Sequence, residues 1–152
     1  MKFLIRLSFI LLLSLLIQSC SKEEKEISLI QEVDQEQEMI LVYNDAVKAL
    51  NKGDTFYAAK KFLESELLLP QSDWAPKSAL MASYAYYLQD FYSEAIFNLE
   101  RFIETYPGNK NESYAYFLLA MCYYETIIDE KKDVGPLINA KKKFEALISI
   151  IF

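Results

Sequence analysis

Few side chains in this sequence could carry out chemistry. The 152-residue chain has no histidine, so the commonest general base and the commonest metal ligand are absent. Its three glycines stand far apart and form no glycine-rich phosphate loop. Adjacent carboxylates such as Glu23-Glu24 and Asp129-Glu130 lie in charged segments that are typical of a solvated surface. We therefore expect neither an enzyme nor a bound metal or cofactor.

The two cysteines differ in their surroundings. Cys122 lies inside an apolar run, which favours a buried, inert thiol over a reactive one. Cys20 ends an N-terminal segment that has the pattern of a secretory signal. Lys2 and Arg6 give that segment a basic start, and residues 7–17 are apolar apart from two serines. This apolar run is shorter than the roughly 20 residues that span a membrane.

The residues that end at Cys20 resemble the lipobox of bacterial lipoproteins. The motif is Ile17-Gln18-Ser19-Cys20, with a small residue before the cysteine. In such proteins the cysteine is acylated and becomes the new N-terminus, so the resemblance implies a signal peptide at 1–19 and lipidation of Cys20. Several acyl chains on one residue anchor a protein stably. In such proteins an aspartate directly after the cysteine tends to retain the protein at the inner membrane. Here Ser21 stands at that position, so the resemblance implies that the protein is anchored in the outer membrane and faces the periplasm. The alternative is a free thiol at the end of a membrane-anchor helix.

The charge of the chain excludes one class of partner. Removal of residues 1–19 takes away Lys2 and Arg6, which leaves 14 basic against 22 acidic residues and a net charge near −8. Nucleic-acid binding requires clustered lysine and arginine to neutralise phosphates. We therefore expect no nucleic-acid partner and no broad adhesion to anionic lipid.

Two segments follow the signal. Residues 20–37 are charged and poor in aromatic side chains, which predicts a lipidated cysteine and a flexible tether. Residues 38–152 have helical periodicity and an internal repeat. Similar residues recur at intervals of 37. In the second helix of the pair, the positions of Ala58, Phe62 and Pro70 are taken up again by Ala95, Leu99 and Pro107. In the first helix, the position of Ala46 is taken by Ser83 and then by Ala120.

This pattern resembles the tetratricopeptide repeat, in which small residues let paired helices approach and a proline follows the second helix. It implies an all-α solenoid of about three helix pairs, with first helices near 39–51, 74–89 and 111–127. Polar residues that could cap the third and fifth helices are Ser72, Asp73, Asn109 and Asn111. The third repeat is incomplete: Ala140 lies 45 residues after Ala95, and the apolar run "FEALISIIF" stands at the end without a cap. We expect either a fragment of a longer repeat protein or a naturally short protein that pairs this edge with another chain.

Longer blocks resemble the BamD family of outer-membrane assembly lipoproteins. They are W-A-P-K at 74–77, A-Y-Y at 85–87, Y-x-x-A-I at 92–96, R-F-I-x-x-Y-P at 101–107 and S-Y-A-Y-F-L-L-A at 113–120. The resemblance implies a periplasmic solenoid of about five repeats that works with the barrel subunit BamA and the lipoprotein BamC. N-terminal repeats of the family are implicated in receiving unfolded β-barrel proteins through their C-terminal signal, and C-terminal repeats carry the main contacts to BamA and BamC. The alternative is another periplasmic repeat lipoprotein that acts as a cell-envelope scaffold.

In such a solenoid the first helix of each repeat lines the concave face. Positions taken relative to Ala46, Ser83 and Ala120 predict the groove. The residues that we expect to bind peptide there are Tyr43, Lys77, Leu80, Tyr84, Tyr87, Tyr114, Phe117 and Tyr124. Tyrosine offers a large contact area with a polar tip, which suits an extended chain that has alternating apolar residues. Lys77 and Arg101 could bind a terminal carboxylate. The alternatives are that the aromatic residues pack helix on helix and that Arg101 pairs with a nearby acid.

Overall fold

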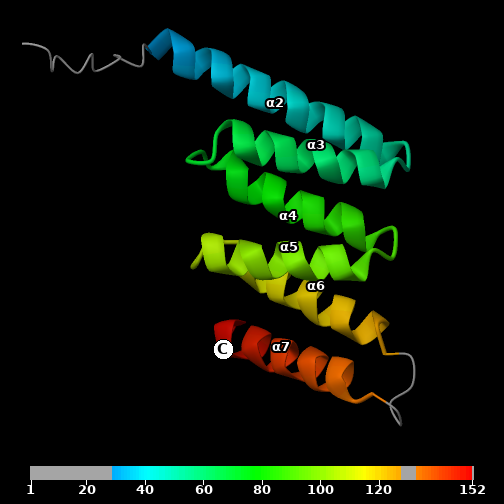
Figure 1. Cartoon of the computed structure of the whole chain (residues 1–152). Helices are drawn as coiled ribbons and strands as arrows, with labels where there is room; N and C mark the ends of the chain where they lie inside the picture. The colour runs from blue at the N-terminus through cyan, green and yellow to red at the C-terminus, as the bar shows by residue number, and fades with distance from the viewer. Residues whose placement is uncertain (1–28, 128–132, 152) are drawn as a thin grey trace, which may run out of the picture.

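The computed structural model describes residues 29–127 and 133–151, which form six α-helices. The helices are α2 (Leu29–Asn51), α3 (Thr55–Leu68), α4 (Trp74–Tyr87), α5 (Tyr92–Thr105), α6 (Glu112–Glu125) and α7 (Gly135–Ile151). Consecutive helices run antiparallel and each packs mainly on its neighbours in the chain (Figure 1). The described residues therefore form three helix pairs in one stack, and the predicted all-α solenoid is confirmed.

The helix boundaries correct one prediction. Helix α2 begins at Leu29, so residues 29–37 are helical and the predicted tether at 20–37 is wrong over this stretch. The side chains from Asp34 to Glu38 are all exposed. Residues 34–38 are all acidic or amide side chains and carry no amphipathic period, which is why composition alone indicated a tether. The signal at 1–19, the lipidation site Cys20 and residues 21–28 lie outside the described residues.

The turns use fewer side-chain caps than expected. Asp54, which was not predicted, caps α3 by accepting a hydrogen bond from the backbone N–H of Tyr57 at 3.3 Å. Neither Asp73 nor Asn111 makes a side-chain cap, and Ser72 Oγ donates instead to the carbonyl of Leu69 at 2.8 Å. Asn109 Oδ1 accepts a hydrogen bond from the backbone N–H of Asn111, which precedes α6, and so it does not cap a helical N–H. Asp73 and Asn111 thus occupy the N-cap positions of α4 and α6, as predicted, but the capping hydrogen bonds expected of their side chains are not formed.

Two glycines close the turns within and between the repeats. Gly53 and Gly108 have φ values of +84° and +73°, a region that side chains with a Cβ rarely occupy. Pro70 and Pro107 follow the ends of α3 and α5, as the repeat pattern predicts.

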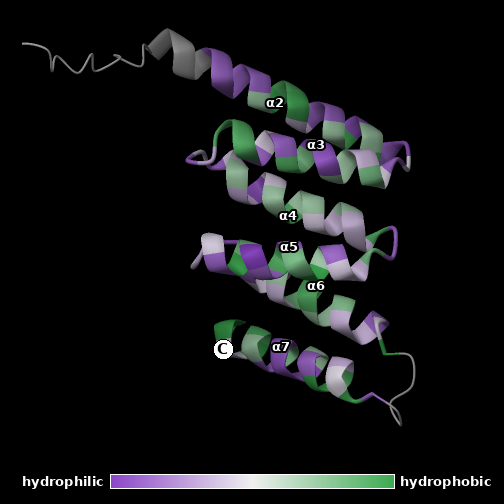
Figure 2. Ribbon diagram, in the orientation of Figure 1, coloured by the Kyte–Doolittle hydropathy of each residue, from purple (hydrophilic) through white to green (hydrophobic). Residues whose placement is uncertain are grey.

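A seam of small residues runs through the stack. Alanines at helix crossings are fully or almost fully buried, among them Ala46, Ala58, Ala59, Ala79, Ala82, Ala85, Ala95, Ala115, Ala120 and Ala140. Large side chains fill the spaces between them, above all Phe62, Phe102, Leu99 and Leu119. Polar residues interrupt the hydrophobic colour along every helix in Figure 2, so each helix buries one side only.

Three buried serine hydroxyls in this seam are paired. Ser65 Oγ lies 3.3 Å from the carbonyl of Met39 and 3.1 Å from Ser78 Oγ, so it joins α3 to α2 and to α4. Ser83 Oγ donates to the carbonyl of Ala79 at 3.0 Å within α4. Serine therefore serves as a small residue here at no cost in unpaired polar atoms.

None of the helices in the described ranges combines the length and the apolar composition that crossing a membrane requires.

Candidate functional site

Aromatic side chains gather where α4 meets α6. We call the set Tyr84, Tyr87, Tyr114, Phe117 and Tyr124 the aromatic face. Tyr84 and Tyr87 are half-buried against the core, and Tyr114 stands opposite them on α6. Burial raises the pKa of Tyr114, and the charges of Tyr84 and Tyr87 add to that rise. The ring of Tyr114 is also 6.3 Å from that of Phe117.

Exposure increases along the stack. Tyr43 and Leu80 are each only 7 % exposed, so the prediction that they face an open groove is wrong. Their counterpart Phe117 is 43 % exposed. One cause is the Trp74 ring of α4, which packs edge-on against the Tyr43 ring with 5.1 Å between the ring centres and so covers it. Tyr114 and Tyr124 are 43 % and 57 % exposed.

Lys77 lies in the first turn of α4, at the start of the second repeat. Its ammonium group is 4.4 Å from the centre of the Trp74 ring and 5.0 Å from that of Tyr43. Both rings attract the cation and limit where the flexible side chain can go. The residue itself is exposed. The structure thus places a positive charge, held by two aromatic rings, at the α4 side of the aromatic face.

Arg101 forms an ion pair between two helices, whereas we first expected it to bind a terminal carboxylate. Its Nη1 and Nη2 donate to Oε1 and Oε2 of Glu66 at 2.6 and 2.7 Å, and this bidentate pair joins α5 to α3. The hydrogen bonds to Glu66 raise the pKa of Arg101. The predicted alternative, pairing with a nearby acid, is therefore correct, and Arg101 is not free to bind a terminal carboxylate.

The residues missed by the sequence analysis are Glu66 and Tyr106. Tyr106 Oη donates to Glu66 Oε1 at 2.8 Å, and burial together with this hydrogen bond raises the pKa of Tyr106. A glutamate near the end of α3, on a helix that carries three other charged residues, gives no signal of burial. The Y-P pair at the end of α5 could have drawn attention to Tyr106, because the residue before a proline has a restricted backbone.

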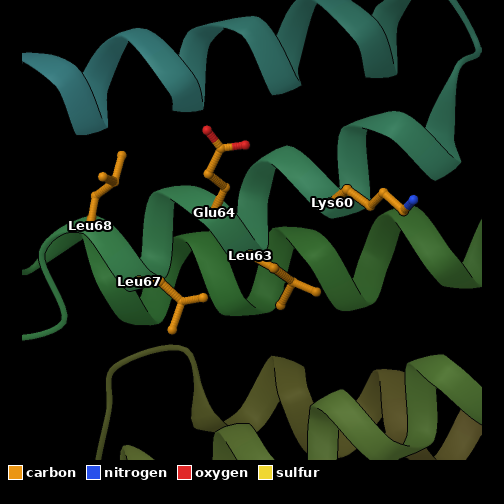
Figure 3. Close-up of a pocket in the computed structure, with 5 residues that line it drawn as sticks. All are labelled: Lys60, Leu63, Glu64, Leu67 and Leu68. Carbon is orange, nitrogen blue, oxygen red and sulfur yellow. The ribbon is translucent and has the colours of Figure 1, made fainter.

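A second surface feature lies on the outer side of α3. Lys60, Leu63, Glu64, Leu67 and Leu68 line an open, mostly apolar depression of about 380 Å³. In Figure 3, Leu63 and Leu67 point away from α2, whereas Glu64 and Leu68 point toward it. Every lining residue comes from α3, and Leu67 is 74 % exposed. This depression is separate from the aromatic face.

Over the described part of the chain, no group of three or more histidine, cysteine or acidic side chains could hold a metal ion. Cys122 is fully buried in α6, as predicted, and burial raises the pKa of its thiol to about 12. A thiol in this state is a poor nucleophile at neutral pH. The arrangement is suited to binding through aromatic surface, with one lysine at its edge.

These features define a helical-repeat protein with a partly exposed aromatic face. Residues 35–150 match the family model described as YfiO, outer membrane lipoprotein, so the chain belongs to this family. The predicted resemblance and the outer-membrane location are thereby confirmed.

Two curated relatives match, and each is named outer membrane protein assembly factor BamD. The protein from Caulobacter vibrioides is 37 % identical over 117 residues, which are 77 % of this chain and 37 % of the relative. The protein from Rickettsia prowazekii is 28 % identical over 143 residues, which are 94 % of this chain and 55 % of the relative. The matched regions thus cover between about a third and about half of these relatives.

The buried thiol predicts an alkaline loss of stability. Because the folded protein raises the pKa of Cys122 from 9.0 to about 12, it favours the neutral thiol. This contribution is fully present below pH 9 and is lost as the pH rises toward 12. We expect the free energy of unfolding in urea, measured relative to Cys122→Ala, to be constant from pH 6 to 8 and to fall by about 1 kcal/mol by pH 10. A difference between the two proteins that is the same at every pH would contradict the burial of the thiol.

Proposed function

We propose that this chain is a lipid-anchored component of the machinery that assembles outer-membrane proteins. It is held at the membrane through acylated Cys20, faces the periplasm, and binds unfolded β-barrel proteins on its aromatic face to help their folding and insertion. It acts by binding alone, together with BamA and the other assembly lipoproteins. Family membership and the printed names of the two relatives support the role in assembly. The observation that carries the binding step is the cluster of partly exposed rings from Tyr84 to Tyr114.

The physical fit is between an extended chain and a row of rings. An unfolded barrel strand alternates apolar and polar side chains, so every second residue can contact the same surface. Tyrosine rings provide that contact at a small loss of conformational entropy, and their hydroxyls stay available for hydrogen bonds to a peptide backbone. Helical repeats leave such a row in place because their helices are rigid.

Lys77 supplies the second half of the fit. A peptide that ends in an aromatic residue carries a terminal carboxylate, and an ammonium group held over Trp74 and Tyr43 can bind it. The acidic character of the rest of the chain makes this local positive charge selective for one end of the peptide.

A scaffold role in the cell envelope is the second candidate. Leu67 and Phe97 are 74 % and 67 % exposed on the second helices α3 and α5, which is unusual for side chains of this size. These residues form a surface distinct from the aromatic face, so the two candidates can be separated by mutation.

The peptide-binding proposal predicts a loss of affinity in the Tyr84→Ala, Tyr114→Ala double variant. We expect a fluorescent peptide that corresponds to the C-terminal strand of a barrel protein to bind the wild type, and the double variant to bind at least about tenfold more weakly because two ring contacts are lost. Fluorescence anisotropy measures the affinity. The matched control is Tyr57→Ala, Phe97→Ala, which removes two exposed rings from α3 and α5 and should change affinity by less than about twofold.

Circular dichroism must show equal helicity in all three proteins. If the control variant loses binding and the Tyr84, Tyr114 variant keeps it, the outer surface is the binding site and the scaffold role gains support. If the folded wild type ignores the peptide, the substrate-binding proposal is wrong.

The anchor proposal predicts that Cys20 carries the lipid. Cells that express the full chain and are fed an alkyne-tagged fatty acid should label the wild type and Cys122→Ser equally, since Cys122 is buried. Cys20→Ser should lose the label and leave the membrane fraction. Label that persists in Cys20→Ser would exclude acylation at this residue.

A further inference from the structure

Glu66 is a carboxylate that the fold has almost completely enclosed. It is 4 % exposed, in the last turns of α3. Three hydrogen bonds satisfy it: two from the Arg101 guanidinium and one from the Tyr106 hydroxyl. Both partners belong to α5 or its C-terminal end, so one side chain joins the second helix of the first repeat to the second helix of the next. We call Glu66, Arg101 and Tyr106 the buried triad.

The buried triad lies beside the turn that leads into α4. Tyr106 and Thr105 share the lining of a small cavity with Pro70, Ser72 and Pro76, which form that turn and the first turn of α4. Figure 1 shows the C-terminal ends of α3 and α5 on the same side of the stack as the start of α4. The same first turn of α4 carries Trp74 and Lys77. Tyr106 of the triad therefore lies across a cavity from the backbone from which those two side chains project.

The junction between the second and third repeats is held less firmly. Tyr123 Oη donates to Glu100 Oε1 at 3.0 Å, and Lys143 Nζ lies 3.7 Å from the same oxygen. Glu100 and Lys143 are both partly open to solvent, so water screens their attraction. A bidentate pair in a buried position constrains geometry far more than a long contact at the surface.

We propose that Glu66, Arg101 and Tyr106 are positioning residues for peptide binding: they fix the start of α4 so that Lys77, Trp74 and Tyr43 hold their arrangement at the edge of the aromatic face. This inference rests on the proposed peptide-binding function. None of the three triad residues needs to contact the peptide. They act through the α3–α4 turn and through the distance between α3 and α5.

The charge on Glu66 is the part of the triad that can be removed with least change in shape. In Glu66→Gln one oxygen is replaced by an N–H₂ group, which cannot accept from Arg101 and leaves that guanidinium without its buried counter-charge. In Tyr106→Phe only one hydroxyl is lost, while the ring, whose centre lies 5.5 Å from that of Phe102, is kept. Glu64→Gln is a matched control two residues away on the exposed side of α3, because Glu64 pairs with Lys61 at the surface.

The test uses the full chain in detergent and two measurements. Trp74 is the only tryptophan, so acrylamide quenching of its fluorescence reports the first turn of α4 without any ligand. Anisotropy of the labelled barrel C-terminal peptide reports affinity. We expect Glu66→Gln to expose Trp74 to quencher and to weaken peptide binding by about five- to tenfold, as coupled contacts in one network do. Tyr106→Phe should change both in the same direction by a smaller factor, and Glu64→Gln should change neither.

The outcomes separate this inference from the proposed function. Variants that unfold more easily in urea, yet keep wild-type Trp74 quenching and wild-type peptide affinity, would overturn the positioning role and leave the triad a purely structural one. If Glu66→Gln does not fold, Tyr106→Phe decides by the same two measurements. If the wild type binds no peptide, the proposed function fails, while Trp74 quenching still shows whether the triad orders the start of α4.

Discussion

Close approach of helices through alanine is the constraint on which the rest of this structure depends. Alanines such as Ala58, Ala79 and Ala95 are fully buried where neighbouring helices cross. A seam this narrow has no room for aromatic rings, so the chain's many tyrosines and phenylalanines lie beside it. Some of them fill the spaces between helices, as Phe62 and Phe102 do, and the others reach the surface. The aromatic face is thus a consequence of how the helices pack and not an addition to the fold.

The same close packing explains why a buried acid can be tolerated. A lone carboxylate in a hydrophobic seam would be strongly destabilising, but Glu66 emerges where the second helices of two repeats come within reach of each other. Arg101 and Tyr106 then satisfy it fully. Such a pair contributes little net stability compared with apolar packing, yet it is specific in direction and distance. Its place between repeats suits the role in setting geometry that we propose for it.

Sequence patterns predicted where the helices lie better than they predicted which side chains are exposed. The spacing of Ala46, Ser83 and Ala120 was sufficient to place the three first helices, because small residues recur wherever helices cross. The start of α2 was missed, since residues 34–38 form a helix that is exposed on all sides. Exposure within the predicted site could not follow from register alone: Tyr43 and Phe117 occupy equivalent positions, but only Tyr43 is covered by the ring of Trp74. Glu66 escaped prediction because its partner lies 35 residues away in the chain.

We propose that an unfolded outer-membrane protein lies across the aromatic face in the cell, and site-specific photo-crosslinking is the most direct test of this contact. A photoreactive phenylalanine analogue is placed in the full chain at Tyr114, on the aromatic face, or at Phe97, on the outer side of α5. We expect ultraviolet-dependent crosslinks from position 114 to newly made barrel proteins, identified by mass spectrometry, and none from position 97. Crosslinks to barrel proteins from position 97 with none from position 114 would contradict it.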